Sequence, residues 1–302
     1  MLRSFSQRRA RRLQGAAAAA ALVLAMAGLT ACRTPPRAVA PPPAYPVRVA
    51  LVSDTHTTRG TNAVQRLHAP RLEQVIQDVN LLGVDLVLMP GDLTENGEAD
   101  EYRDFKRQIQ GFKAPVWMVP GNHDVGNKNI AGSKKSVSSA GVRAFERALG
   151  PSTWVREHAG LRVVGANGPL FGSGLQEEAR MWSVLDKALA ATNKLPTLLM
   201  VHYPPFMKSA SEPGGVYWNL EPSPRARLLA LMEQAGVRTL VSGHLHRNLT
   251  NQFKNITLIT TTTIAAADPQ KKQKPGWMLL RVAADGVAEI EPRYLTRDPG
   301  AP

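Results

Sequence analysis

The sequence has very little cysteine, and this excludes whole classes of protein. Its one cysteine, Cys32, has no disulfide partner and no neighbouring metal ligands, so a disulfide framework and a cysteine-based zinc site are excluded. Lysine and arginine outnumber the acids by 37 to 24, yet no dense basic run with interleaved aromatics indicates a nucleic-acid site. With 43% hydrophobic and 6% aromatic residues, the 302-residue chain has the composition of a globular protein with one large domain or two modest ones.

The first 31 residues contain no acid at all. Five arginines within residues 1–13 precede an almost purely apolar stretch, residues 16–29. As a helix, this stretch would span about 21 Å at ~1.5 Å per residue, which is too short to cross a membrane comfortably but typical of a signal peptide. It ends in Leu29-Thr30-Ala31-Cys32, which resembles a bacterial lipobox.

The lipobox resemblance implies that the sulfur of Cys32 carries a diacylglyceryl group and that cleavage frees its amine. We therefore predict a lipoprotein signal peptide over residues 1–31. The protein would be exported and lipid-anchored to a bacterial membrane, facing the periplasm or the cell exterior. An ordinary cleaved signal peptide and an N-terminal membrane anchor are the alternatives, and the paired arginines also allow twin-arginine export.

The proline-rich residues 32–46 predict an extended tether between this anchor and the folded domain. Without residues 1–31 the chain has 32 basic and 24 acidic residues, a net charge of +8. This excess suits an anionic substrate or an anionic lipid surface.

From Val47 onward, short apolar strands alternate with amphipathic helices. Apolar residues recur at helical spacing over 72–82, and Gly83 ends that helix. The same reading predicts strands at 47–53, 84–89, 116–119, 161–166, 197–201 and 237–241, and helices around 102–109, 177–191 and 222–235. Residues 125–139 are interpreted as a loop near the site, and the tail has β-like stretches at 257–264, 277–282 and 287–290. This alternation predicts an α/β domain over residues 47–302.

Five predicted strands end in blocks of Asp, Asn or His. These blocks are Asp54-Thr55-His56, Gly91-Asp92, Gly121-Asn122-His123-Asp124, His202 and Gly243-His244-Leu245-His246. Ligands of open α/β sheets bind beyond the carboxyl ends of the strands, so we expect these side chains to converge on one rim. Carboxylates and neutral imidazoles are donors that suit Mn, Fe or Zn.

Each of these residues also has an ordinary structural explanation. Asp54 or Asp92 could cap a helix, and Asn122 could supply a left-handed turn. The histidines could be packed or loop residues, and their agreement in order is what argues against coincidence. His68 and His158 fit none of the blocks and are interpreted as ordinary surface residues.

The five blocks in this order resemble the signature of the calcineurin-like metallophosphoesterases, D-x-H, G-D, G-N-H-D, H and G-H-x-H. The resemblance covers residues 47–246. It implies a four-layer α-β-β-α sandwich of two packed, mostly mixed sheets flanked by helices. It also implies a phosphoester hydrolase in which a hydroxide held between two metal ions (Mn, Fe or Zn) attacks phosphorus in line.

The same resemblance assigns a role to each residue. Asp54, His56 and His246 would bind the first metal, Asn122, His202 and His244 the second, and Asp92 would bridge the two. His123 would protonate the leaving alkoxide or hold a phosphoryl oxygen, oriented by Asp124.

Two positions depart from relatives within the superfamily. Purple acid phosphatases carry a metal-binding tyrosine three residues after the G-D aspartate, where this chain has Glu95, so a tyrosinate–iron site is not expected. The H-H-P-P motif of the family is His202-Tyr203-Pro204-Pro205 here. A phenol would therefore replace an imidazole near the leaving-group side, which leaves the substrate open.

The resemblance implies that the substrate is a small phosphoester, either a monoester or a diester. Residues 91–105 and 118–124 resemble the class III cyclic-nucleotide phosphodiesterases, which makes 3′,5′-cyclic nucleotides an alternative. Export favours a broader enzyme, since cyclic AMP signalling is cytosolic. A non-catalytic metal-binding surface lipoprotein is the alternative from another class. A DNA exonuclease is disfavoured because basic runs and a large capping domain are lacking, and no nucleic-acid partner is expected. The oligomeric state stays open.

Overall fold

The computed structural model describes residues 45–130, 135–190, 194–265 and 274–296. The predicted signal peptide, Cys32 and most of the predicted tether lie outside these residues. Within them, no helix has both the length and the apolar character needed to cross a membrane.

The elements follow the alternation expected from the sequence. The strands are β1 (Val47–Leu51), β2 (Leu86–Met89), β3 (Val116–Met118), β4 (Trp154–His158), β5 (Leu161–Gly165), β6 (Thr197–Met200), β7 (Thr239–Ser242), β8 (Leu249–Phe253), β9 (Ile256–Thr260), β10 (Gly276–Val282) and β11 (Ala288–Tyr294). The α-helices are α1 (His68–Leu82), α2 (Ala99–Ile109), α3 (Asn122–Val125), α4 (Ser139–Leu149), α5 (Gln176–Ala190) and α6 (Pro222–Gln234), and 3₁₀ turns occur at η1 (Gln65–Leu67) and η2 (Gly168–Leu170).

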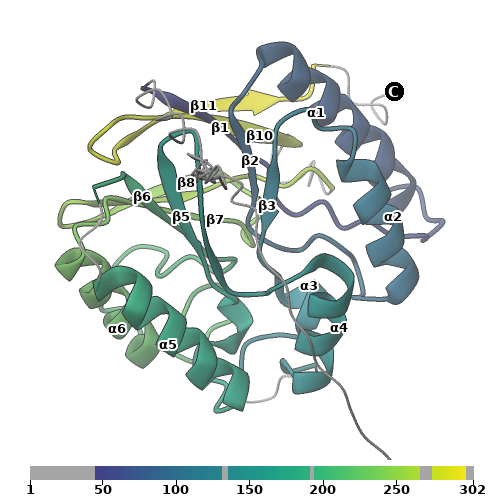
Figure 1. Ribbon diagram of the computed structural model, residues 1–302. Helices are drawn as coiled ribbons and strands as arrows, with labels where there is room; N and C mark the ends of the chain where they lie inside the picture. Colours follow the sequence, from purple (N-terminus) through teal and green to yellow (C-terminus); the bar gives the residue numbers. More distant parts are fainter. Residues whose placement is uncertain (1–44, 131–134, 191–193, 266–273, 297–302) are drawn as a thin grey trace, which may run out of the picture. The chain divides into compact units, whose positions relative to one another are not determined.

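Two mixed sheets form the centre of the domain (Figure 1). The first has the order β11-β10-β1-β2-β3. Strands β1, β2 and β3 are parallel, and β10 is antiparallel to both of its neighbours, β1 and β11. The second has the order β4-β5-β6-β7-β9-β8, with β5, β6, β7 and β9 parallel and an antiparallel strand at each edge. The parallel strands put their carboxyl ends at a common edge, where the predicted site residues follow.

Both faces of each sheet are covered, which explains the continuous apolar runs of the central strands. Along β1, Val47, Val49 and Leu51 face the second sheet and pack with residues of β5, β6, β7 and β9. Ala50, and Val52 just after the strand, point the other way, into a cluster with the helices. Helices α1 and α2 lie against the first sheet, and α5 and α6 lie against the second (Figure 1). The predicted four-layer α-β-β-α sandwich is confirmed.

The helix boundaries also follow from local chemistry. In α1, Leu72, Val75, Ile76 and Val79 recur at a spacing of three and four residues, and all four are buried. Gly83 ends the helix with φ of 64°, a left-handed conformation that glycine adopts without steric cost. The sequence-based prediction missed α3, α4, β4 and β8. Helix α3 has only four residues, and β4 and β8 have few buried residues, whereas α4 is an amphipathic helix of 11 residues that the prediction overlooked.

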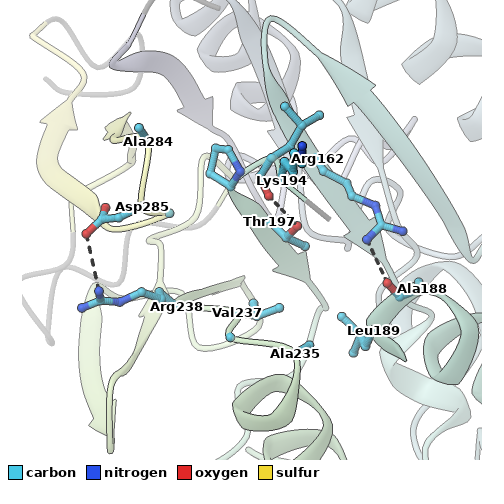
Figure 2. Close-up of a pocket in the computed structure, with 14 residues that line it drawn as sticks. Arg162, Ala188, Leu189, Lys194, Thr197, Ala235, Val237, Arg238, Ala284 and Asp285 are labelled. Atoms are coloured by element: carbon cyan, nitrogen blue, oxygen red, sulfur yellow. Dashed lines mark hydrogen bonds and ion pairs between the residues drawn. The ribbon is translucent and has the colours of Figure 1, made fainter. Parts of the chain in front are cut away.

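A polar cavity of about 200 Å³ lies at the opposite ends of β6 and β7 from the predicted site (Figure 2). Two of its three cationic residues contact the protein: Arg162 Nη1 donates to the Ala188 carbonyl near the end of α5 (2.8 Å), and Arg238 pairs with Asp285 (3.5 Å). Basic side chains commonly satisfy the last carbonyls of a helix in this way. We therefore attribute a structural role to these residues.

Candidate active site

All seven predicted metal ligands lie at the carboxyl ends of the parallel strands. Asp54 and His56 follow β1, Asp92 follows β2, Asn122 follows β3, His202 follows β6, and His244 and His246 follow β7. Their donor atoms form two compact groups, one from Asp54, His56, Asp92 and His246 and the other from Asp92, His202 and His244. Asp92 belongs to both groups, as a residue that bridges two metals would have to.

The first group directs two imidazole nitrogens and two carboxylates to one point. His246 Nε2 lies 3.2 Å from Asp54 Oδ1 and 3.2 Å from His56 Nε2, which is itself 3.7 Å from Asp92 Oδ2. On its other side, His56 Nδ1 lies 2.9 Å from a Glu95 carboxylate oxygen. A bond of this kind leaves the Nε2 lone pair available for a metal.

The second group has the same construction around His202. Its Nδ1 donates to the Pro90 carbonyl (2.8 Å), which directs Nε2 towards Asp92 Oδ2 (3.3 Å) and Asn122 Oδ1 (3.0 Å). His202 is fully buried, so the carbonyl that holds it fixes both its tautomer and its orientation.

The backbone is in a left-handed conformation at five of these ligand positions. Asp54, His56, Asp92, His244 and His246 have φ between 44° and 71°, and they account for five of the seven non-glycine residues with positive φ in the described chain. Such conformations cost about 1–3 kcal/mol each and persist where the surrounding structure over-determines them, typically at functional sites. The strain here coincides with the polar strand ends.

Two glycines are required because backbone and side chains approach so closely. A Cβ on Gly121 would lie 2.2 Å from the backbone nitrogen and Oδ1 of Asp92. One on Gly243 would lie 2.5 Å from Asp54 Oδ2. Any side chain at either position would displace an aspartate of the site.

The pKa shifts show that the site holds buried negative charge. Burial opposes ionisation of Asp92, but the imidazole of His202 holds the pKa of this carboxyl well below its ordinary value. Burial likewise opposes protonation of His202, yet Asp92 raises the pKa of His202 to about 9. Burial and the charge of His202 lower the pKa of His244 to about 3, so this imidazole is neutral. The buried carboxylates thus retain a proton nearby, and bound cations would take over its compensating role. The donor set fits two metal ions.

His123 lies beside the first group without belonging to the predicted ligand set. Its ring meets that of His56 edge-on, with centroids 4.5 Å apart, and its side chain is 33% exposed. Its Nδ1 lies 2.7 Å from the Glu95 carbonyl, which leaves Nε2 for a group in the adjoining cleft. Burial lowers the pKa of His123, but the nearby Asp92 carboxylate and the bond to Glu95 raise it overall.

The prediction that Asp124 orients His123 is wrong. The Asp124 carboxylate accepts hydrogen bonds from the backbone nitrogens of Leu93 (3.1 Å), Thr94 (2.9 Å) and Gly121 (2.8 Å) and from the Thr94 hydroxyl (2.8 Å). These bonds join the loop after β2 to the loop after β3. Asp124 therefore supports the backbone beneath the site, and Glu95 holds the His123 ring.

Two further interpretations need correction. His68 is buried rather than on the surface, and its Nδ1 lies 2.8 Å from the carbonyl of His56, behind the first group. The surface interpretation holds for His158, which is exposed. The phenol of Tyr203 does not face the leaving-group side: Tyr203 is fully buried, and its hydroxyl lies 3.4 Å from the backbone nitrogen of Lys128.

The tyrosine that does reach the site is Tyr217, which the sequence reading missed. Its hydroxyl accepts a hydrogen bond from Asn122 Nδ2 (3.0 Å), and its carbonyl lies 3.3 Å from His244 Nε2. It follows the Gly214-Gly215 pair in a segment without helical or strand periodicity. The signal in the sequence that could have indicated Tyr217 is an aromatic residue two positions after a glycine pair.

A cleft of about 440 Å³ opens beside Asn122 and His123. Glu95, Asn96 and Gly97 line it from the loop after β2, and Tyr217 lines it from another part of the chain. It also contacts Asp124, Val125, Gly126, Asn127, Lys135 and Gly141. A group of the size of an esterified alcohol fits beside His123 in this space.

The sequence over residues 47–248 matches the family described as calcineurin-like phosphoesterase. The chain belongs to this family. Membership of this family, together with the His/Asp cluster, identifies the protein as a metal-dependent phosphoester hydrolase. Its site is suited to two metal ions.

Individual relatives carry different activities in their names. A probable glycerophosphodiester phosphodiesterase, GpdQ, of Arcobacter nitrofigilis is 30% identical over 225 residues, which cover 71% of this chain and 77% of the relative. The 3′,5′-cyclic adenosine monophosphate phosphodiesterase CpdA of Escherichia coli K12 is 27% identical over 220 residues, covering 68% and 73%.

Among solved structures, the purple acid phosphatase PPD1 from seeds of yellow lupin (Lupinus luteus) has the same fold, with a TM-score of 0.57 at 18% identity. The similarity covers 82% of this chain and 51% of the lupin protein, so this chain spans about half the length of that phosphatase.

Proposed function

We propose that this calcineurin-like phosphoesterase hydrolyses small phosphodiesters with two bound metal ions. Asp54, His56 and His246 would bind one ion, Asn122, His202 and His244 the other, and Asp92 both. The observation that carries this proposal is the position of Asp92, whose carboxylate belongs to two donor groups at once. When bound, the ions supply an activated water and neutralise the phosphoryl oxygens, which is the usual contribution of paired metals to phosphoester hydrolysis.

His123 is the group that handles the proton in this proposal. An alkoxide is a poor leaving group near pH 7, and protonation by a positioned imidazole typically contributes 10²–10⁴-fold to the rate. The Nδ1 bond to the Glu95 carbonyl orients the ring and leaves Nε2 free to carry a proton towards the leaving group. The departing alcohol would occupy the cleft that His123 and Asn122 line.

Among phosphodiesters, those of glycerol are favoured. Polar residues line the cleft beside His123, among them Asn96 and Asn127, and such a lining suits a hydroxyl-rich alcohol. The relative named as a glycerophosphodiester phosphodiesterase and the expected export of the chain support the same substrate class. A 3′,5′-cyclic nucleotide is the second candidate, supported by residues 91–105 and by the relative named CpdA.

A hydrolysis panel distinguishes these substrates. Purified residues 33–302 would be loaded with Mn, Fe or Zn and given para-nitrophenyl phosphate, bis-para-nitrophenyl phosphate, 2′,3′- and 3′,5′-cyclic AMP and glycerophosphoethanolamine. We expect the highest kcat/KM for the glycerophosphodiester. A preference for 3′,5′-cyclic AMP would favour the second candidate, and a preference for the monoester would overturn both. Metal binding without activity on any ester would instead favour a binding protein.

We also propose that the protein is exported and anchored through lipid on Cys32, with residues 1–31 as the signal peptide. The lone cysteine after Leu29-Thr30-Ala31 supports this proposal. Labelled fatty acid should enter the wild-type protein and the membrane fraction should contain it, whereas Cys32→Ser should lose both properties. Labelling of Cys32→Ser at the wild-type level would exclude lipidation at this residue.

A further inference from the structure

Tyr217 touches two of the residues proposed to hold the second metal, through two different groups. Its phenolic oxygen accepts from Asn122 Nδ2 at 3.0 Å. Its backbone carbonyl lies 3.3 Å from His244 Nε2. The rings of Tyr217 and His244 are also in contact, with centroids 4.7 Å apart.

The bond to Asn122 decides which end of its amide faces the site. An asparagine side chain has one oxygen that can bind a metal and one NH₂ group that cannot, and the two ends have nearly the same shape. With Nδ2 donating to the phenol, Asn122 Oδ1 lies 3.0 Å from His202 Nε2, among the donors of the second group. Without that acceptor, the amide loses the bond that favours this orientation over one with its NH₂ group towards the site.

The contact with His244 likewise decides which atom of a proposed ligand is free to bind a metal. Donation from Nε2 to the Tyr217 carbonyl places the ring proton on Nε2 and leaves the Nδ1 lone pair free to bind a metal. Because this contact uses the backbone of Tyr217, substitution of the side chain leaves it in place. The two contacts can therefore be tested separately.

The segment that carries Tyr217, residues 203–221, is held by polar bonds rather than left loose. Glu212 accepts from the backbone nitrogens of Met207 (2.8 Å) and Ser209 (3.2 Å) and from Asn219 Nδ2 (2.7 Å). Glu221 accepts from the backbone nitrogen of Gly215 at 2.9 Å. Such a framework positions the phenol before any ligand binds.

We propose that Tyr217 is a positioning residue of the second metal site, where it fixes the amide of Asn122 with its oxygen towards the metal. This inference rests on the proposed function, because it presupposes that Asn122 and His244 bind a metal. Partners of this kind behind a ligand typically account for 10–100-fold in metal affinity. The expected loss of affinity concerns the second metal, since the proposed ligands that Tyr217 contacts are Asn122 and His244.

The test is Tyr217→Phe, with Tyr203→Phe as a matched control. Both tyrosines pack against the His244 ring, but the Tyr203 hydroxyl meets the backbone of Lys128 rather than a proposed ligand. Zinc bound to the full chain would be measured by mass spectrometry at graded chelator concentrations. We expect Tyr217→Phe to weaken the second zinc 10–100-fold and leave the first within about twofold of wild type. Tyr203→Phe should leave both within about twofold.

Further variants separate a positioning effect from a loss of structure. In an Asn122→Ala background, Tyr217→Phe should lower the affinity for the second zinc by less than a further twofold, because the phenol would have no amide to orient. Equal loss of both zinc ions in Tyr217→Phe, or no change in the second, would overturn the inference while leaving the proposed function intact. Binding of only one zinc by the wild-type protein would contradict the proposed function itself, and this inference with it.

Discussion

The Glu95 carboxylate lies 2.9 Å from Nδ1 of His56, at the position where purple acid phosphatases carry their metal-binding tyrosine. The backbone carbonyl of the same glutamate lies 2.7 Å from Nδ1 of His123. One residue thus orients a proposed ligand of the first metal with its side chain and the proposed proton donor with its backbone. Glu95 therefore lies behind the proposed site, in contact with both histidines.

The first prediction concerns that carboxylate. Glu95→Gln should weaken the first metal about tenfold, because a neutral amide raises the basicity of His56 less than a carboxylate does. The second metal should be affected less, since the contacts of Glu95 are with His56 and His123. Chelator titration with mass spectrometry measures both affinities, and Glu289→Gln, on the exposed face of β11, is the control. Unchanged affinity for both ions would show that the His56 contact does not support metal binding.

Asp92→Ala should abolish phosphodiester hydrolysis and the binding of both metals, because its carboxylate belongs to both donor groups. Asp285→Ala, far from the site beside Arg238, should retain two metals and full activity. Metal content after dialysis and the rate of bis-para-nitrophenyl phosphate hydrolysis are the measurements. Retention of one tightly bound metal by Asp92→Ala would argue against a bridging role.

His123→Ala should keep both metals but lose activity in proportion to the difficulty of the leaving group. We expect a loss of about 10²–10⁴-fold for a glycerophosphodiester, whose alkoxide needs a proton, and less than about tenfold for a para-nitrophenyl ester, which leaves unprotonated. Burial lowers the pKa of His123, but the Asp92 carboxylate and the bond to the Glu95 carbonyl raise it overall. Because the leaving alcohol takes its proton from the imidazolium, the wild-type rate on the glycerophosphodiester should fall as pH rises through the pKa of His123, and the variant should lack that limb. Loss of metal from His123→Ala would overturn the assigned role.

Asp124→Asn should lower stability rather than change the chemistry. The carboxylate now accepts hydrogen bonds from backbone N–H groups, and the amide of asparagine would place an NH₂ group, itself a donor, against some of them. We expect a loss of about 2 kcal/mol, which in a domain of this size lowers the Tm by roughly 4–8 °C. The dependence of the rate on the leaving group should remain that of wild type, as calorimetry and kinetics together can show. A leaving-group dependence like that of His123→Ala would restore Asp124 to the proton-transfer pair.

Lys128 and Glu221 form an ion pair whose two partners should respond differently to mutation. The Lys128 side chain is fully buried, whereas that of Glu221 is 22% exposed. Glu221→Gln would leave a buried cation without its partner and should cost about 3–5 kcal/mol. Lys128→Met should cost less, because water can solvate the remaining carboxylate. Urea unfolding measures both values, and a larger loss in Lys128→Met would contradict the argument.

Much of the fold was predictable because the central strands are buried on both faces. Their apolar runs, together with the helical spacing of Leu72, Val75, Ile76 and Val79, placed α1, β2, β3, β6 and β7 close to their observed bounds. The sequence missed β4 and β8, the two antiparallel edge strands of the second sheet, which have few buried residues. Edge strands pair on one side, so their apolar pattern is weak. Periodicity likewise could not show how the two sheets pack, which the family resemblance supplied.

The sequence by itself determined which side chains gather at the site, because order along the chain and placement after parallel strands bring Asp54, Asp92, Asn122, His202 and His244 to one edge. Only the tertiary structure decided how they are held. Asp124 accepts hydrogen bonds from backbone nitrogens of two loops, and Glu95 contacts His56 and His123. Tyr217 contacts Asn122 although the two are 95 residues apart in the sequence. Strand ends are fixed by local pattern and sheet direction, whereas contacts between loops depend on where separate segments finally pack.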